Sequence, residues 1–298
     1  MEYEEINGYQ LKSDFATENA GNCRWSFAQK DGYDYFIKEF LSPKYPLDES
    51  LFGPELTQKK RESAELFFYQ KERFYQCLAK CRTGNNVIVL DFFRSGTKYY
   101  AVSEQIKGRF FTIQEIAALS EDAKYTLIRS ILYSISVLHK MHIVHSDLRP
   151  DNILIIPTIG GYCTAKIIDF DDGFWETEPP KELKGSQNYF SPEAVRRIKG
   201  EPVSVTTKSD IWALGLLFHQ YWTGRMPTFS DEYHYASEAA LNSSPLAISD
   251  SVPDLLKHIL REMLSAEPDD RPTAEDALMI LSSGHSNGTG WSVPSDLD

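Results

Sequence analysis

The feature that most constrains this chain is a short polar loop between two apolar runs. The loop lies within residues 143–152 and is followed by the apolar residues 153–156. Asp147 and Asn152 stand five positions apart in it, and we expect the loop to connect a helix to a strand. Phosphoryl transfer requires this pairing, because one carboxylate accepts the proton of an attacking hydroxyl and one amide oxygen helps to hold Mg²⁺ on the nucleotide phosphates.

A second carboxylate follows the next apolar strand. Residues 165–168 lead directly into Asp169 and Phe170, so Asp169 is placed to chelate Mg²⁺ between phosphates. Taken alone, an Asp and an Asn in a loop are ordinary turn residues. Two such groups in this order, each beside an apolar strand, favour the functional interpretation.

Length and composition limit how large the folded core can be, and the net charge limits which kinds of molecule the protein can bind. The 298 residues, 42% of them hydrophobic and 25% charged, can bury a sizeable core in one large domain or two lobes. The net charge of −12 opposes binding to a polyanion, so we expect neither nucleic acid nor a membrane as a partner. Basic peptide segments would suit this charge better.

The ends and the cysteines indicate a compartment. Residues 1–5 lack the basic start and apolar core of a signal peptide, and no stretch approaches the roughly 20 apolar residues of a membrane span. The four cysteines follow no zinc-binding spacing and fit a reducing compartment. We therefore expect a cytoplasmic protein, with export into another cell as an effector left open.

Hydrophobic periodicity predicts an α+β protein with two lobes. Alternating segments predict strands over 9–11, 24–28, 33–40, 87–93 and 99–106, with one long helix over 56–80. After Gly108 the pattern becomes mainly helical, with two short strands around the Gly160-Gly161 turn. The predicted parts are a β-sheet lobe over 1–106, a helical lobe over 107–281 and a mobile tail over 282–298.

With these residues in view, the chain from about 9 to 281 resembles a eukaryotic-type Ser/Thr protein kinase domain. Lys38 ends a Tyr-Phe-Ile-Lys run where that family has Val-Ala-Ile-Lys. His145-Ser146-Asp147 stands in place of His-Arg-Asp, and Asp169-Phe170-Asp171 in place of Asp-Phe-Gly. Three further motifs of the family match 185–193, 210–215 and 270–273, and the last supplies Arg271, which by resemblance pairs with Glu193.

The resemblance implies a two-lobed fold, ATP with Mg²⁺ or Mn²⁺, protein substrates and a set of site residues. The implied catalytic residues are Asp147 as proton acceptor, Lys38 on the phosphates, Arg149 as a charge screen and Asn152, with Asn152 and Asp169 as metal ligands. The implied nucleotide-binding residues are Lys38, Gly21, Cys23, Glu65, the backbone of Glu104 and Ile106, and Leu154.

The chain departs from the family at several of these positions. The first two glycines of the phosphate-covering loop are replaced by Ala16 and Glu18, and the Glu18 carboxylate should repel phosphate or turn outward. Ser146 replaces the arginine that, in the family, binds the phosphate of a phosphorylated activation loop. In addition, Thr177 is the only residue with a hydroxyl group between Asp169 and Gly185. We infer that activity does not need phosphorylation there.

The sequence is also compatible with two other functions. The degenerate glycine loop and Asp171 would suit a pseudokinase that serves as a scaffold, although a scaffold has no chemical need for four phosphate-handling groups. The same Asp171 and the Asp147–Asn152 spacing also occur in small-molecule kinases of the aminoglycoside and choline type. The helix partner of Lys38 is open too: Glu65 is preferred for its apolar neighbours, and Glu72 is the alternative.

Overall fold

The structure is a computed structural model that describes residues 4–18, 21–47, 53–82, 85–108 and 110–283. Its final helix includes Ser282 and Ser283, so the predicted tail is helical at its first two positions. Residues 284–298 of that tail lie outside the described residues. The chain divides into two compact units, which we call the N-terminal unit (Met1–Gly108 with Ile167–Phe170) and the C-terminal unit (Arg109–Lys166 with Asp171–Asp298).

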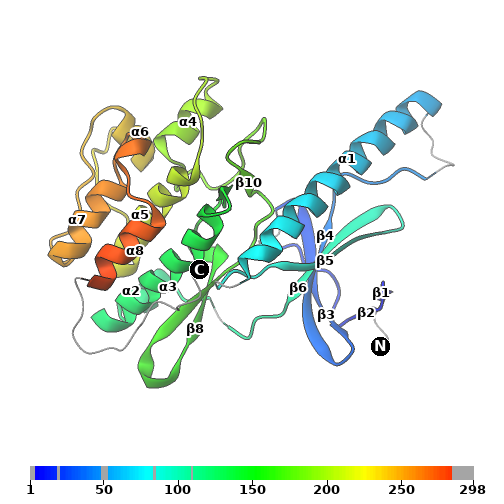
Figure 1. Ribbon diagram of the computed structural model, residues 1–298, viewed down its shortest axis with the longest axis horizontal. Helices are drawn as coiled ribbons and strands as arrows, with labels where there is room; N and C mark the ends of the chain where they lie inside the picture. Colours follow the sequence, from blue (N-terminus) through cyan, green and yellow to red (C-terminus); the bar gives the residue numbers. More distant parts are fainter. Residues whose placement is uncertain (1–3, 19–20, 48–52, 83–84, 109, 284–298) are drawn as a thin grey trace. The chain divides into compact units, whose positions relative to one another are not determined.

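The N-terminal unit is built on a six-stranded antiparallel sheet in the order β1-β2-β3-β4-β6-β5 (Figure 1). The predicted strands are confirmed, and one two-residue strand, β1, was not predicted. The elements are β1 (Glu5–Ile6), β2 (Tyr9–Leu11), β3 (Cys23–Lys30), β4 (Tyr33–Phe40), α1 (Pro54–Leu78), the 3-10 turn η1 (Ala79–Cys81), β5 (Val89–Ser95) and β6 (Lys98–Glu104).

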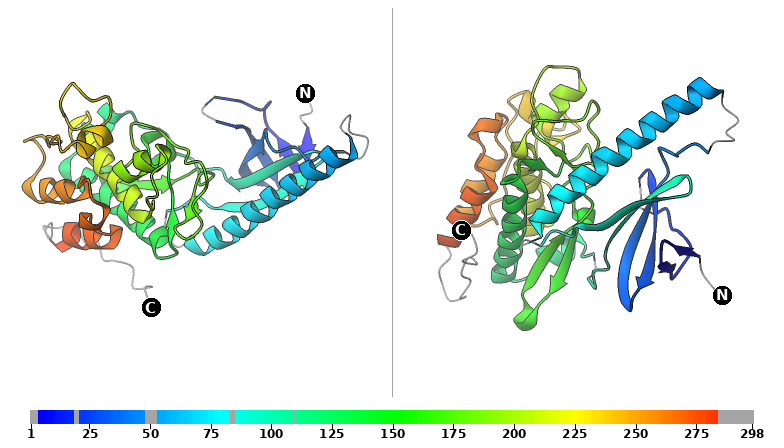
Figure 2. Two further views of the ribbon diagram at one scale, coloured as in Figure 1. Left: turned by 90° about the horizontal axis from the view of Figure 1, so that it is seen from above. Right: turned by 45° about the vertical axis from the view of Figure 1, so that its right-hand side comes forward.

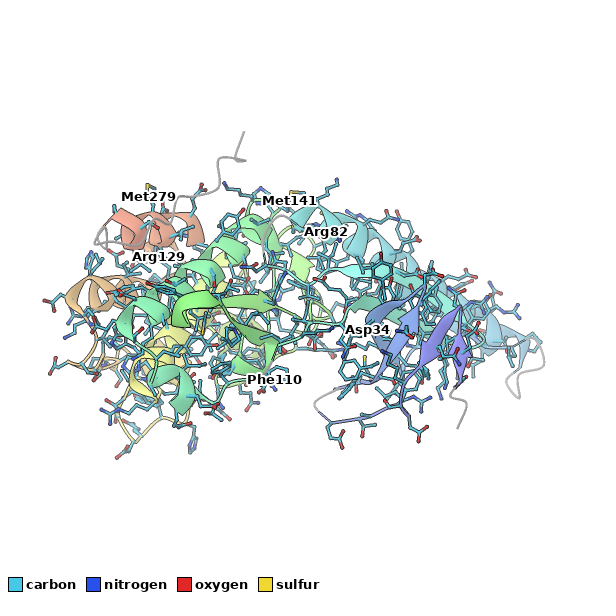
Figure 3. The ribbon with its side chains drawn as sticks, turned by 90° about the horizontal axis from the view of Figure 1, so that it is seen from below. Asp34, Arg82, Phe110, Arg129, Met141 and Met279 are labelled. Atoms are coloured by element: carbon cyan, nitrogen blue, oxygen red, sulfur yellow. The ribbon has the colours of Figure 1, made fainter. Side chains whose placement is uncertain are left out.

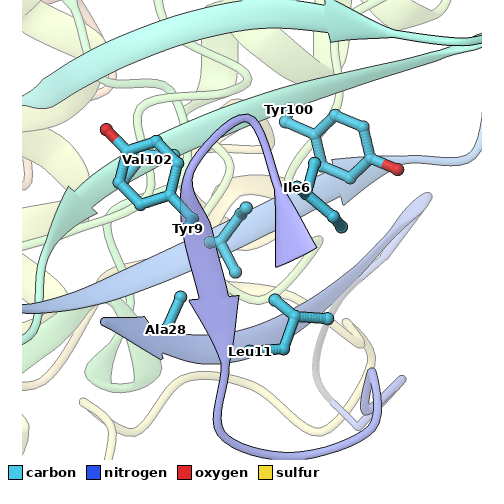
Figure 4. Close-up of a cluster of buried hydrophobic side chains, with 7 residues drawn as sticks. Ile6, Tyr9, Leu11, Ala28, Tyr100 and Val102 are labelled. Carbon is cyan, nitrogen blue, oxygen red and sulfur yellow. The ribbon is translucent and has the colours of Figure 1, made fainter. Parts of the chain in front are cut away.

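One face of this sheet curls around an apolar cluster (Figure 4). The Tyr9 ring of β2 stacks on Phe93 of β5 with centroids 6.0 Å apart, and its hydroxyl donates to Asp91 at 3.1 Å. The sheet therefore bends until its second strand, β2, meets its last strand, β5, which encloses side chains that a flat sheet would leave in water. The buried members are Ile6, Tyr9, Leu11, Ala28, Ile37, Tyr100 and Val102.

The long helix α1 covers the opposite face of the sheet (Figure 2). Pro54 stands in its first turn, where the missing N–H costs nothing, and no glycine or proline interrupts the following residues to Leu78. Phe67 and Phe68 pack on Phe92 of β5 and Tyr99 of β6, with ring centroids 5.1 to 6.4 Å apart. Aromatic packing, rather than helix propensity, holds α1 to the sheet.

The C-terminal unit is mainly helical, with two small two-stranded sheets, β7 with β10 and β8 with β9. Its first elements are α2 (Ile113–Ala117), α3 (Glu121–His139), β7 (Ile143–Val144), η2 (Pro150–Asn152), β8 (Ile153–Pro157), η3 (Ile159–Gly161), β9 (Cys163–Ile167) and β10 (Phe174–Trp175). The remaining elements are α4 (Pro192–Ile198), α5 (Thr207–Thr223), α6 (Ala236–Leu241), α7 (Asp254–Met263), η4 (Pro268–Asp270) and α8 (Ala274–Ser283).

Helix α5 is the centre of this unit, because it is buried on all sides. A Cβ on its Gly215 would lie 2.9 Å from the Leu264 side chain, so only glycine permits this close approach after α7. Helix α3 is buried against α8, where the buried Arg129 (labelled in Figure 3) donates to the carbonyl of Leu281 at 3.1 Å. No helix in the described part of the chain is long and apolar enough to cross a membrane.

A buried ion pair joins Glu193, at the end of the 185–193 motif, to Arg271, which follows η4, as the resemblance implied. Arg271 is 1% exposed, and both its terminal nitrogens donate to the Glu193 carboxylate at 2.8 Å. Its remaining three N–H bonds go to the carbonyls of Ser265, Ala266 and Lys208. All five guanidinium donors are therefore satisfied, which is the condition under which a buried charge is tolerated.

We expect Arg271→Met to lower the free energy of unfolding by about 3–5 kcal/mol, because it leaves the Glu193 carboxylate buried without its counter-charge. Urea denaturation measures the change. The matched control is Lys140→Met, which removes the exposed ion pair with Glu275 and should cost less than about 1 kcal/mol. Equal losses in the two variants would contradict the role given to Arg271.

Candidate active site

The polar loop singled out in the sequence connects β7 to β8 and has an unusual backbone. Ser146 adopts φ +71°, a left-handed conformation that a non-glycine residue holds only when its surroundings impose it. Here the conformation is imposed by the carboxylate of Asp210 in α5, a residue that is 2% exposed. Its oxygens accept the backbone N–H of His145 at 2.8 Å and that of Ser146 at 3.0 Å.

Asp210 also contacts the ring of His139, the last residue of α3, with the Oδ2 to Nε2 distance at 3.1 Å. One carboxylate thus joins α3, α5 and the loop. The sequence motif pointed to Asp210, but its bonds to the backbone of the loop could not be predicted from spacing alone.

The loop presents the carboxylate of Asp147, which is held on both oxygens. Asn152 Nδ2 donates to Asp147 Oδ2 at 2.9 Å and to the Asp147 carbonyl at 2.7 Å, so the structure brings together the two residues that the sequence paired. Asp147 Oδ1 accepts the backbone N–H of Ser186 at 3.1 Å. A Cβ on the preceding Gly185, which has φ +135°, would lie 3.0 Å from the Ser146 carbonyl, so glycine is required there.

The environment of Asp147 raises the pKa of its carboxyl group. Burial raises the pKa of this carboxyl group, and the charges of His145 and Arg149 together with the bonds from Asn152 and Ser186 only partly oppose that effect. A carboxylate with a raised pKa is a better proton acceptor than an exposed one.

Asn152 and Asp169 can each offer an oxygen to a hard metal ion. Because the Asn152 amide nitrogen donates to Asp147, the carbonyl oxygen of the same amide is the group that could face a cation. Mg²⁺ in proteins is usually held by one or two such oxygens together with phosphates and water. Each of the two residues therefore has the chemistry expected of a ligand in its own unit.

Lys38 and Asp169 form an ion pair within the N-terminal unit, with Nζ 2.8 Å from Oδ1. Asp169 reaches this position because residues 167–170 join that unit. Ile167 lies beside Asn86 in a parallel bridge and exchanges backbone hydrogen bonds with Asn85 and Val87 at 2.9 and 2.8 Å. The segment thus returns to the sheet unit just before the Asp-Phe-Asp motif.

The phosphate-covering loop was predicted in the connection between β2 and β3. Trp25 of β3 holds this connection by hydrogen bonds to its backbone. Ala16 and Trp25 exchange backbone hydrogen bonds at 2.8 and 2.9 Å, and the Trp25 indole donates to the Glu18 carbonyl at 2.9 Å. The Glu18 side chain is exposed. Gly21 has φ +55° and Cys23 begins β3 as a buried residue.

The other predicted nucleotide contacts lie in β6, just after it, and in β8. Glu104 is the last residue of β6, Ile106 lies two residues after it and is half-buried, and Leu154 is a buried residue of β8.

Arg149 forms an ion pair with the carboxylate of Asp151, two residues farther along the chain. A guanidinium has five donors, so this pair leaves Arg149 able to contact an anion as well.

The preferred helix partner of Lys38 is poorly placed for that role. Glu65 is exposed, and its carboxylate accepts from the Tyr45 hydroxyl at 3.4 Å. Glu72 is half-buried, so burial favours it over Glu65. The pairing of Lys38 with a glutamate of α1 stays a prediction.

A further anchor, Glu176, escaped the sequence analysis. One carboxylate oxygen accepts the backbone N–H and the hydroxyl of Thr207 at the start of α5, both at 2.8 Å, and the other lies 3.0 Å from His142 Nδ1. Burial alone would raise the pKa of Glu176, but these bonds together lower it below its usual value. A Phe-Trp-Glu sequence carries no local signal of such a role.

Comparison with known proteins agrees with this geometry. The family model described as protein kinase domain matches residues 56–280. The chain is 27% identical over 204 residues to serine/threonine-protein kinase TIO of Arabidopsis thaliana, which covers 66% of this chain and 14% of that protein. It is 28% identical over 205 residues to a probable myosin light chain kinase of Dictyostelium discoideum, covering 65% and 64% respectively.

A calcium/calmodulin-dependent serine/threonine-protein kinase of Malus domestica is 26% identical over 299 aligned positions, which cover 92% of this chain and 70% of that protein. The chain thus spans less than two thirds of the length of the Arabidopsis and Dictyostelium relatives.

We expect Asp210→Asn to release part of the loop, because an amide has a single acceptor oxygen for the two backbone N–H groups. Hydrogen exchange of the amides of His145 and Ser146 measures this, and at least one should exchange about tenfold faster, the equivalent of a lost charge-assisted hydrogen bond. Asp250→Asn, which alters an exposed carboxylate, is the control. Unchanged protection at both amides would refute the anchoring role.

Proposed function

We propose, from the premise that this chain belongs to the protein kinase family, that it transfers the γ-phosphoryl group of ATP to serine or threonine hydroxyls of proteins. The chain is a protein kinase, a phosphotransferase, and its relatives carry the names of serine/threonine kinases. The single observation that carries the proposal is the Asp147 carboxylate, which Asn152 and Ser186 hold on both oxygens.

Each site residue has a role that follows from its contacts. Asp147 would accept the proton of the substrate hydroxyl as the oxygen attacks phosphorus. Lys38, an ammonium already paired with Asp169, would orient the nucleotide phosphates. Arg149 would screen charge on the phosphoryl group in flight. Such catalysis consists mostly of positioning and charge neutralisation, because the phosphoryl group needs little covalent help.

Asn152 and Asp169 would hold Mg²⁺ or Mn²⁺, which neutralises charge on the phosphates of bound ATP. The carbonyl oxygen of Asn152 and the carboxylate of Asp169 are the donor types that such ions prefer. Gly21, Cys23, Leu154 and the backbone at 104–106 would form the surroundings of the base and phosphates.

The substrates we expect are proteins with basic segments. The chain carries 43 acidic against 31 basic side chains, and a negative surface raises the local concentration of positively charged peptides. Serine or threonine specificity follows from the family motif at Gly185-Ser186 and from the names of the relatives.

We also propose that the activation segment, which by resemblance runs from Asp169 to Glu193, needs no phosphate. Its early part is joined to the start of α5 by the Glu176 carboxylate, which accepts the backbone N–H and the hydroxyl of Thr207. Farther along, Arg197 donates to the Pro180 carbonyl at 3.1 Å. These bonds supply the charge-assisted contacts that a phosphate would otherwise form with arginine, and Ser146 replaces the arginine that such a phosphate would need.

We expect Asp147→Asn to abolish phosphoryl transfer and to leave nucleotide binding nearly intact, because the amide cannot accept a proton but keeps the shape of the carboxylate. The measurement is transfer of labelled γ-phosphate from Mg²⁺-ATP to the protein itself and to a generic basic protein, with phosphoresidue analysis. Wild-type label on serine or threonine that disappears in the variant is the expected result.

Retained turnover in Asp147→Asn would overturn the role of this residue. If the wild type binds ATP but labels neither protein, the acceptor is of another kind, and a screen of small-molecule hydroxyl acceptors follows. If the wild type binds no ATP, the chain does not carry out the proposed reaction.

For the activation segment, we expect Glu176→Ala to lower kcat/KM about tenfold, since it removes two hydrogen bonds to a carboxylate worth about 1.5–3 kcal/mol each before the segment readjusts. Steady-state kinetics of the unphosphorylated protein provide the measurement. Phosphatase treatment and Thr177→Ala should each leave the wild-type rate unchanged.

The matched control is Glu182→Ala, an exposed glutamate of the same segment, which should retain wild-type kinetics. A protein that loses activity on phosphatase treatment would contradict phosphate-independent ordering.

A further inference from the structure

A single buried carboxylate on the curled side of the sheet binds groups from two other strands. Glu39 of β4 is 2% exposed. It accepts two bonds from the Arg24 guanidinium of β3, at 2.7 and 3.1 Å, and one from the Lys98 ammonium of β6 at 3.1 Å. The Tyr100 hydroxyl of β6 adds a fourth bond at 2.9 Å.

This carboxylate is ionised in the fold. Burial alone would raise the pKa of Glu39, but the bonds from Arg24, Tyr100 and Lys98 together lower it. The contact with Glu39 in turn raises the pKa of Arg24. Two cations and a hydroxyl converge on one anion beside the apolar cluster of Figure 4, where low polarity strengthens each bond.

The register of the sheet connects this network to Lys38. Arg24, Glu39 and Tyr100 face one another across β3, β4 and β6, and the adjoining row is Trp25, Lys38 and Ala101. Successive side chains of a strand point to opposite faces. Glu39 therefore holds β4 through contacts on the curled side of the sheet. The adjacent Lys38 side chain lies on the other side, where it pairs with Asp169.

The same network reaches the connection that was predicted to cover the phosphates. The Arg24 guanidinium lies over the Phe15 ring, 4.7 Å from its centroid, and the Phe15 ring also contacts Tyr100 at 6.4 Å. Phe15 immediately precedes Ala16, which is bonded to Trp25 in the adjoining row. Phe15 thus packs on two residues that Glu39 binds, and Ala16 and Glu18 are bonded to Trp25, the neighbour of Arg24 on β3.

We propose that Glu39 is a positioning residue for the binding of nucleotide phosphates, acting through Lys38 and through the connection at residues 15–18. This inference rests on the proposed function and adds a residue that the family motifs do not include. In a chain that lacks two glycines of the phosphate-covering loop, the Glu39 network keeps the loop base and the phosphate-binding lysine in one fixed arrangement.

The test separates phosphate binding from binding of the base. Equilibrium dissociation constants of Mg²⁺-ATP and of adenosine are measured for the full chain and its variants. We expect Glu39→Gln to weaken Mg²⁺-ATP binding about tenfold, since small misplacements of a positioned group are costly, and to change adenosine binding by less than about twofold, because adenosine has no phosphate for Lys38 to contact. A role in stability alone would weaken both ligands equally.

Two further variants complete the design. Tyr100→Phe removes one hydrogen bond and keeps the ring, so it should fold and should weaken Mg²⁺-ATP about threefold with adenosine unchanged. Asp34→Asn is the matched control on the same strand, because Asp34 (labelled in Figure 3) pairs with the exposed Lys12 outside the network. It should leave both constants unchanged.

Two results for Glu39→Gln would overturn the inference, provided that the wild type binds Mg²⁺-ATP. One is an equal weakening of Mg²⁺-ATP and adenosine binding, and the other is no change in either dissociation constant. If Glu39→Gln shows no cooperative thermal unfolding, the same comparison in Tyr100→Phe decides. A wild type that fails to bind Mg²⁺-ATP would overturn both this inference and the proposed function.

Discussion

The loop that carries Asp147 depends on one buried carboxylate. Asp210 accepts the backbone N–H groups of His145 and Ser146, and this charge compensates for the left-handed backbone at Ser146. Because the backbone turns there, the next side chain, Asp147, can be held by Asn152 on one oxygen and by Ser186 on the other. The Asp147 carboxylate, which we propose as the proton acceptor, is thus held by Asn152 and Ser186. The backbone that precedes it is held by Asp210, a residue of a helix about 60 positions farther along the chain.

The N-terminal unit has a similar arrangement next to Lys38, which we propose to contact the nucleotide phosphates. Lys38 lies on a strand whose next residue, Glu39, is bound by two cations and a tyrosine from the flanking strands. In each unit, a buried and hydrogen-bonded carboxylate thus orders the backbone next to a residue of the proposed site. Such carboxylates are costly to bury, and they are kept where an ordered geometry is needed. The Arg271–Glu193 pair, with all its guanidinium donors satisfied, does the same for the end of the activation segment.

Much of the fold and of the site could be predicted from local pattern. Alternation and helical periodicity predicted the strands β2 to β6 and the long helix, and the family motifs predicted the pairing of Glu193 with Arg271. The two-residue strand β1 is too short to carry a periodic signal. The glutamate of α1 that pairs with Lys38 stays a prediction. Glu65 is exposed and Glu72 is half-buried, a difference that depends on which side of the helix packs against the rest of the chain and that the local sequence does not specify.

The sequence by itself determined which residues are available for the proposed reaction, since Asp147, Asn152 and Asp169 stand at fixed places beside strands that the local pattern predicts. The tertiary structure alone decided which charged residues are buried. Lys38 and Glu39 are adjacent and equally polar in the sequence, but the curled sheet encloses one face of β4 and leaves the other for α1 and Asp169. Burial arises from contacts between segments far apart in the chain, such as Tyr9 with Phe93, so no local pattern could distinguish a solvated glutamate from one that holds three strands together.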